Sequence, residues 1–93
     1  MKKYTITGEV EIFPQKGGWY YIQVPVEITQ PLKNFADRGL IPILAKIGSS
    51  TWKTSLLPKG DGTHFIALKQ KVRKKENIFL GDIIQVEFHV RTK

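Results

Sequence analysis

Cysteine is absent from the 93 residues of this sequence. Without thiols the chain has no disulfide, no thiolate zinc site, no iron–sulfur cluster and no cysteine nucleophile. Long apolar runs are also absent: no segment approaches the roughly 18 residues that span a bilayer, and no signal-peptide core follows the N-terminal lysines. We therefore expect a soluble, cytoplasmic protein with no membrane partner, whose hydrophobic core alone holds the fold.

The length of the chain suits a single domain, predicted over residues 1–93. A chain of roughly 60 residues already buries only about 60% of its surface, so two domains would each lack a core. Hydrophobic residues make up 41% and charged residues 25% of the sequence. These values are typical of globular proteins and argue against disorder, collagen and a coiled coil.

Acidic residues are scarce relative to basic ones. Eight Asp and Glu against fifteen Lys and Arg give a formal net charge of +7. Residues 1–45 carry five basic and four acidic side chains, whereas residues 46–93 carry ten and four. A basic surface attracts nucleic acid, acidic proteins and phosphorylated small molecules without selecting among them.

The spacing of apolar residues predicts six strands, over residues 4–12, 19–24, 40–47, 51–57, 64–68 and 81–90. Glycine-rich turns at 15–18, 48–50 and 58–62 separate several of them, and the first two strands form a hairpin. Pro42 places the start of its strand at a sheet edge or a bulge.

Two short helices are predicted between these strands. In the first, Thr29 is the cap, Pro31 lies in the first turn, and Gly39 closes the C-terminus in the left-handed conformation. The second covers residues 69–76 and is anchored by Val72. Six short strands with tight turns favour an all-β fold: a small closed barrel of about six strands, because closure removes the exposed edges.

The run 69–75 holds five cations, Lys69, Lys71, Arg73, Lys74 and Lys75, and no acid. It either grips phosphates or is a solvated helix face, and the solvated face is favoured because no aromatic residue for base contact lies within the run.

Four aromatic residues, Trp19, Tyr20, Tyr21 and Trp52, have two interpretations. Exposed, their rings would form a stacking platform beside cations; buried, they fill a small core. Strand alternation turns one of Tyr20 and Tyr21 outward and places Trp52 inside with Leu56. The core interpretation is favoured.

Catalytic and metal-binding patterns are weak. His64, His89 and Asp61 lack short ligand spacing, and Ser55, His64 and Asp61 lack the nucleophile elbow of a hydrolase. We therefore assign no catalytic, metal or cofactor-binding residue, and an enzyme is disfavoured.

Several motifs resemble the domain-of-unknown-function family nineteen-oh-five. They lie at 17–25, 38–43, 52–62, 72–74 and 81–82, in the same order as in the family, and the longest reads Trp-Lys-Thr-Ser-Leu-Leu-Pro-Lys-Gly-Asp-Gly. The resemblance implies a small bacterial or archaeal β-barrel domain, found alone or fused ahead of a domain linked to bacteriocin resistance. It implies no particular activity, and a chain ending at Lys93 is expected to be the stand-alone form.

Residues 73–84 are also similar to the glycine-aspartate box of cradle-loop barrels, which include double-psi barrels and DNA-binding swapped-hairpin regulators. The resemblance implies a short helix, a Gly81-Asp82 turn fixed by the aspartate, and a strand after it. Lys74 and Lys75 depart from the regulators, in which a leucine is usual there, so the similarity extends to a double-psi-like fold rather than to DNA binding.

We predict a non-enzymatic binding module in which residues 53–64 and the run 69–75 form one cationic face for an anionic ligand or an acidic protein surface. Lys53, Lys59 and Lys69 would supply charge, the amides of 60–62 hydrogen bonds, and Trp52 or Tyr21 apolar contact if exposed. A nucleic-acid-binding barrel, as a monomer or a dimer, is the alternative, and a small hydrolase is the second alternative. The candidate ligand-binding residues are Tyr21, Arg38, Trp52, Lys53, Thr54, Ser55, Lys59, Gly60, Asp61, Gly62, His64, Lys69, Lys71, Arg73, Lys74 and Lys75.

Overall fold

The computed structural model describes residues 2–13 and 18–91. Most of the turn expected at 15–18 therefore lies outside the described residues. Within them the elements are β1 (Tyr4–Glu9), β2 (Glu11–Ile12), β3 (Tyr20–Val24), α1 (Val26–Thr29), the 3-10 helix η1 (Gln30–Phe35), β4 (Ile41–Ile47), β5 (Ser50–Pro58), β6 (His64–Ala67), α2 (Gln70–Glu76) and β7 (Ile83–Val90).

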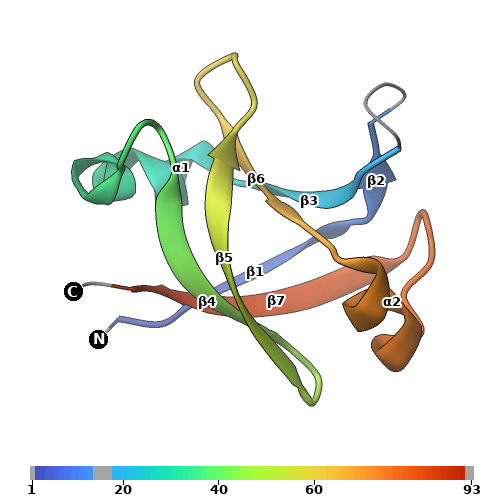
Figure 1. The fold of residues 1–93 in the computed structure, drawn as a ribbon. Coiled ribbons are helices and arrows are strands. Elements are labelled where there is room, and N and C mark those ends of the chain that lie inside the picture. The colour runs from blue at the N-terminus through green and yellow to red at the C-terminus, as the bar shows by residue number, and fades with distance from the viewer. Residues whose placement is uncertain (1, 14–17, 92–93) are drawn as a thin grey trace.

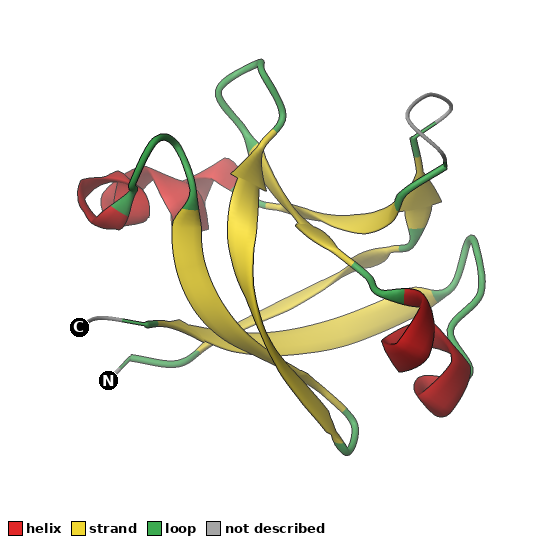
Figure 2. Cartoon of the chain, viewed as in Figure 1, coloured by secondary structure: helices red, strands yellow, loops and turns green. Residues whose placement is uncertain are grey.

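The strands form one antiparallel sheet in the order β1-β7-β4-β5-β6-β3-β2. The sheet curls into a nearly closed barrel, with α1 and η1 at one end and α2 at the other (Figures 1 and 2). Its two outermost strands, β1 and β2, are consecutive in the chain and are joined through Val10. The chain itself therefore bridges the two edges of the nearly closed barrel, and the predicted all-β barrel is confirmed.

The strand predicted over 4–12 is two strands, so the described chain has seven strands rather than six. β1 pairs with β7 along its whole length, and β2 pairs with β3 on the opposite wall. Between them the Val10 amide donates to Asp82 O at 2.8 Å, and the Val10 carbonyl accepts from Gly81 N at 2.9 Å. The alternation of polar and apolar residues over 4–12 does not reveal this break between β1 and β2, because Ile6 and Val10 are both buried, at 3% and 0% exposure.

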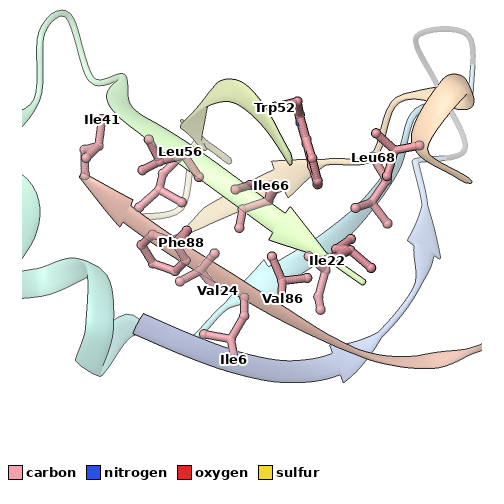
Figure 3. Close-up of a cluster of buried hydrophobic side chains, with 14 of the residues drawn as sticks. Ile6, Ile22, Val24, Ile41, Trp52, Leu56, Ile66, Leu68, Val86 and Phe88 are labelled. Atoms are coloured by element: carbon pink, nitrogen blue, oxygen red, sulfur yellow. The ribbon is translucent and has the colours of Figure 1, made fainter. Parts of the chain in front are cut away.

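The barrel interior is filled by alternate residues of the strands, as the spacing predicted. Figure 3 shows Ile6, Ile22, Ile66 and Phe88 gathered inside the sheet. Val86, Phe88 and Val90 of β7 are all buried. A small barrel has room only for such side chains, so its interior is a packed core.

The first predicted helix begins earlier and ends differently than expected. Pro25, with φ −58° and ψ 139°, precedes α1, and Thr29 lies inside the helical segment with its hydroxyl donating to Val26 O. Helical structure ends at Phe35 because Ala36 is extended. Gly39 (φ 83°) occupies the following 37–40 turn instead of capping the helix.

Pro42 does not mark an edge strand, because β4 lies between β5 and β7. The β4–β7 ladder starts only at Ile43, and the Pro42 carbonyl accepts a hydrogen bond from Arg91 N at 2.9 Å. A proline is tolerated there because its missing N–H falls just beyond the end of that ladder.

The expected glycine-aspartate turn is present after α2. Val72 is 7% exposed and anchors α2, as predicted. Asp82 Oδ2 accepts from Phe79 N at 2.8 Å, Asp82 N donates to Phe79 O at 3.1 Å, and β7 starts at the next residue. In the described part of the chain, no helix has the length and apolar character needed to cross a membrane.

Candidate functional site

The loop 59–63 of the predicted segment 53–64 does not join the run 69–75 in the single cationic face that the sequence predicted. The loop 59–63 precedes β6 and α2 follows it, so they lie at opposite ends of that strand (Figure 1). Sequence spacing could not reveal this, because the direction in which β6 carries the chain across the barrel is set by its pairing with β3 and β5.

At the loop end of β6, the candidate residues are already engaged with one another. Lys59 Nζ donates to Gln23 Oε1 at 3.0 Å and lies 5.0 Å from the centroid of the Tyr21 ring. The Asp61 carboxylate accepts from the hydroxyl and the amide of Thr63, and these bonds lower its pKa. The side chain of Asp61 thus shapes the loop, while Gly60 and Gly62 take the positive φ values of its tip.

Tyr21 and Trp52 are buried, at 5% and 8% exposure, and offer no surface for stacking. The core interpretation of Trp52 is therefore confirmed. Tyr21 instead packs on the outside of the barrel, with its ring centroid 4.2 Å from that of Phe13 and 5.4 Å from that of Phe65. Its hydroxyl donates to Glu11 Oε1 at 3.2 Å.

Ser55, His64 and Asp61 are not assembled into a triad. No hydrogen bond joins any two of them among the described residues: Asp61 is bonded to Thr63, and His64 Nδ1 is buried without a partner. Within the same residues, no three His, Asp or Glu side chains lie together as metal ligands would. The hydrolase alternative gains no support from this arrangement.

The remaining candidates on β5 and before β4 are scattered. Lys53 is exposed on β5 opposite Leu44, and the Thr54 carbonyl accepts from Arg91 at 3.2 Å. Arg38 is exposed in the 37–40 turn, with a positive φ of 57°. None of these three lines the pockets described below.

Arg73 is the best-positioned cation of α2. Its guanidinium carbon lies 3.9 Å from the centroid of the Tyr20 ring, within the range of a cation–π contact. Its Nε donates to Leu68 O at 3.1 Å, which fixes the orientation of the guanidinium plane. Tyr20, on β3, is only half-buried, so this pair lies at the surface where α2 crosses the start of β3.

Two pockets lie on either side of the Tyr20–Arg73 pair, and each contains an exposed aromatic ring. The Trp19 pocket, of about 330 Å³, is lined by Gly18, Trp19, Tyr20, Ala67, Leu68, Lys69, Gln70 and Arg73. The Phe79 pocket, of about 270 Å³, is lined by Tyr20, Arg73, Lys74, Asn77, Ile78, Phe79 and Leu80. Trp19 is 52% and Phe79 66% exposed, so the core interpretation was wrong for Trp19.

A third pocket continues past Lys69 on the other side of α2. The Ser49 pocket, of about 370 Å³, is lined by Ser49, Ser50, Thr51, Trp52, Lys69, Lys71, Val72 and Lys75. Lys69 borders both the Ser49 pocket and the Trp19 pocket, and Tyr20 and Arg73 border both the Trp19 pocket and the Phe79 pocket. The three pockets therefore adjoin around α2. We call them together the α2 groove.

Glu76 directly follows the cationic run 69–75 in the sequence, and its carboxylate is already hydrogen-bonded within the fold. Its carboxylate accepts from Ser50 Oγ at 2.6 Å and from Ser49 Oγ at 3.2 Å. The Ser50 bond is the largest cause of a lowered pKa for Glu76. Glu76 thereby ties the β4–β5 hairpin to α2, and a side chain at Gly48 would collide with it.

The α2 groove gathers five predicted residues, Lys69, Lys71, Arg73, Lys74 and Lys75, together with Trp52 in the wall of one pocket. Sequence reasoning missed Phe79 and Leu80, which are 66% and 55% exposed. Their signal was available: two large apolar residues stand directly before the Gly81-Asp82 turn, where no strand can bury them.

Fold and groove define a small, nearly closed β-barrel domain with a cationic, aromatic-lined surface around one short helix. The chain belongs to the family described as Domain of unknown function (DUF1905), whose model matches residues 7–88 of the 93. The match includes every residue that lines the α2 groove. No protein with curated annotation matches the sequence.

Proposed function

We propose that this protein is a non-enzymatic binding module, and that it takes an anionic ligand bearing a planar apolar group at the Tyr20–Arg73 pair. One observation carries the proposal: the guanidinium of Arg73 lies 3.9 Å over the Tyr20 ring, and both residues border two pockets that each contain an exposed aromatic ring. Charge and flat apolar surface are therefore presented together.

The chemistry of Arg73 suits such a ligand. Its Nε is committed to Leu68 O, which leaves the two terminal NH₂ groups free of any hydrogen bond to a described residue. These groups form a planar fork that matches the oxygens of a phosphate or carboxylate. Because the side chain is half-buried and already oriented, it loses less conformational entropy on binding than a free lysine.

The apolar part of the ligand would lie against Trp19. This ring is 52% exposed beside the guanidinium, in a pocket of about 330 Å³. That volume is at the lower end of small-molecule sites, which are roughly 300–1,000 Å³. A single planar ring system with one anionic group fits this size.

Three small probes test the proposal by chemical-shift titration of the 15N-labelled protein. Adenosine monophosphate carries both a ring and an anion, adenosine only the ring, and ribose 5-phosphate only the anion. We expect adenosine monophosphate to shift the amides of residues 18–20 and 68–73 at lower concentration than either partial probe.

Two variants separate the site from general charge. Arg73→Lys keeps the charge but loses the planar fork, and we expect it to weaken adenosine monophosphate binding by roughly three- to thirty-fold. Lys53→Ala removes one charge outside the α2 groove and should have little effect. Equal responses to adenosine monophosphate and ribose 5-phosphate, with equal weakening in both variants, would contradict the proposal.

A further inference from the structure

Aromatic rings and cations alternate along the α2 groove. From one end, Phe79 and Lys74 border the Phe79 pocket, and Arg73 on Tyr20 separates this pocket from the Trp19 pocket. Trp19 lies in the Trp19 pocket. Lys69 borders both the Trp19 pocket and the Ser49 pocket, and Lys71 and Lys75 lie in the wall of the Ser49 pocket. The succession of surfaces is ring, cation, ring, cation.

We propose that the α2 groove binds single-stranded nucleic acid, with successive bases against Phe79 and Trp19, the phosphate between them against Arg73 and the next phosphate against Lys69. This rests on the proposed function, since it uses the same Tyr20–Arg73 pair, and it names the class of ligand. A nucleic-acid strand repeats a flat base and an anionic phosphate in the order in which the groove repeats its rings and cations.

The exposed rings select an unpaired strand. Phe79 and Trp19 are 66% and 52% exposed, so their faces are open to a flat partner. Within a duplex the bases are stacked on one another and show only their edges, whereas an unpaired base can stack on a protein ring. An acidic protein surface would pair with the lysines, but its carboxylates alone would place no flat ring against either aromatic side chain.

The charge along the groove also suits a polymer better than a mononucleotide. Five cations lie between residues 69 and 75, and the two carboxylates next to them are engaged in the fold. Glu76 accepts from Ser50 and Ser49, and Asp82 accepts from Phe79 N. A mononucleotide would occupy one pocket and leave the second ring and the flanking lysines without partners.

Fluorescence anisotropy with labelled oligonucleotides tests the proposal. The probes are a mixed-sequence single strand as DNA and as RNA, the matching duplex, and an abasic strand of equal length. We expect the affinity of either single strand to be about tenfold higher, or more, than that of the duplex and of the abasic strand, because one stacked base contributes roughly that factor. The DNA and RNA arms show which sugar is preferred.

Single substitutions assign the contacts. Trp19→Ala and Phe79→Ala should each weaken single-strand binding by about tenfold without changing its salt dependence. Lys69→Ala and Lys74→Ala should each reduce the slope of log affinity against log salt by about 0.7. Lys53→Ala, with the same loss of charge outside the groove, should leave both quantities nearly unchanged. Because all five side chains are exposed, these variants should fold, and circular dichroism checks that they do.

Two outcomes would overturn the proposal. An abasic strand that binds as tightly as the base-carrying strand would show attraction by charge alone. Full affinity in both Trp19→Ala and Phe79→Ala would place the strand elsewhere. If adenosine monophosphate still shifts the groove amides in either case, the single-strand proposal is overturned and the proposed anion site stands. If neither the oligonucleotides nor adenosine monophosphate bind, both proposals are overturned.

Discussion

Ser50 at the start of β5 donates a 2.6 Å hydrogen bond to the carboxylate of Glu76, the last residue of α2. The bond joins residues 26 positions apart and holds the β4–β5 hairpin against the helix that carries the groove cations. Ser50 is 7% exposed, so its hydroxyl has little access to water and depends on this partner. The Glu76 carboxylate therefore adds to the buried Val72 in holding α2 on the barrel.

This bond predicts a pH-dependent stability. Because the pKa of Glu76 is lowered in the folded protein, its contribution is complete above the ordinary glutamate pKa of about 4.5 and is lost as pH falls through the lower folded value. Ser50→Ala removes the main cause of the shift. We expect the difference in urea midpoint between wild type and Ser50→Ala to be larger at neutral pH than at about pH 3. Ser55→Ala, at a half-exposed serine of the same strand, is the control, and an unchanged difference would contradict the prediction.

Asp82 fixes the turn that leads into β7. Its Oδ2 accepts from Phe79 N at 2.8 Å, and Asp82→Ala leaves that amide without its partner. We expect a loss of about 1–2 kcal/mol in the free energy of unfolding, measured by urea denaturation. Asp82→Asn keeps a carbonyl acceptor and should lose less. Equal losses in the two variants would indicate that the charge, rather than the hydrogen bond, holds the turn.

Gly8 lets β1 lie close to β3 where the barrel closes. A Cβ at this position would lie 3.2 Å from Ile22 Cγ1 and 3.3 Å from its Cδ1. Ile22 is fully buried and cannot move into solvent, so Gly8→Val should cost about 1–3 kcal/mol in unfolding free energy through overpacking. Ile22→Val in the same chain relieves part of the clash. A double-mutant cycle that gives no coupling between the two positions would contradict this account of closure.

The two tryptophans should report opposite environments. Trp52 is 8% exposed and Trp19 52%, so Trp19→Phe should leave a blue-shifted emission that iodide quenches poorly. Trp52→Phe should leave a red-shifted emission that iodide quenches readily. Similar quenching of the two single-tryptophan variants would be evidence against the exposed ring in the Trp19 pocket.

The cost of Trp52→Phe adds a second readout. Trp52 Nε1 is buried and has no hydrogen-bond partner among residues 2–13 and 18–91, and such a donor costs roughly 1–3 kcal/mol. The substitution removes that penalty while it also removes packing, so we expect a net change in unfolding free energy below about 1.5 kcal/mol. Trp52→Ala, which leaves a cavity, should cost about 3–5 kcal/mol. A loss from Trp52→Phe as large as that from Trp52→Ala would show that the indole N–H is stabilising.

Local chemistry in the sequence determined several elements of this protein, among them β7, α2 and the turn between them. The alternation of Val86, Phe88 and Val90 placed β7, Val72 anchored α2, and Gly81-Asp82 produced the turn between them. Each of these depends on residues a few positions apart, whose backbone periods and hydrogen bonds are decided locally. The barrel followed because short strands with one apolar face must curl to cover it.

Only the tertiary structure decided which surfaces meet. Lys59 and the cations of α2 lie at opposite ends of β6, and Tyr21, which alternation left free to face outward, is covered by Phe13. Arg73 and Tyr20, more than fifty residues apart, are stacked because α2 crosses the start of β3. Such contacts depend on how the whole sheet curls and pairs, a property of long-range packing that no local pattern of residues contains.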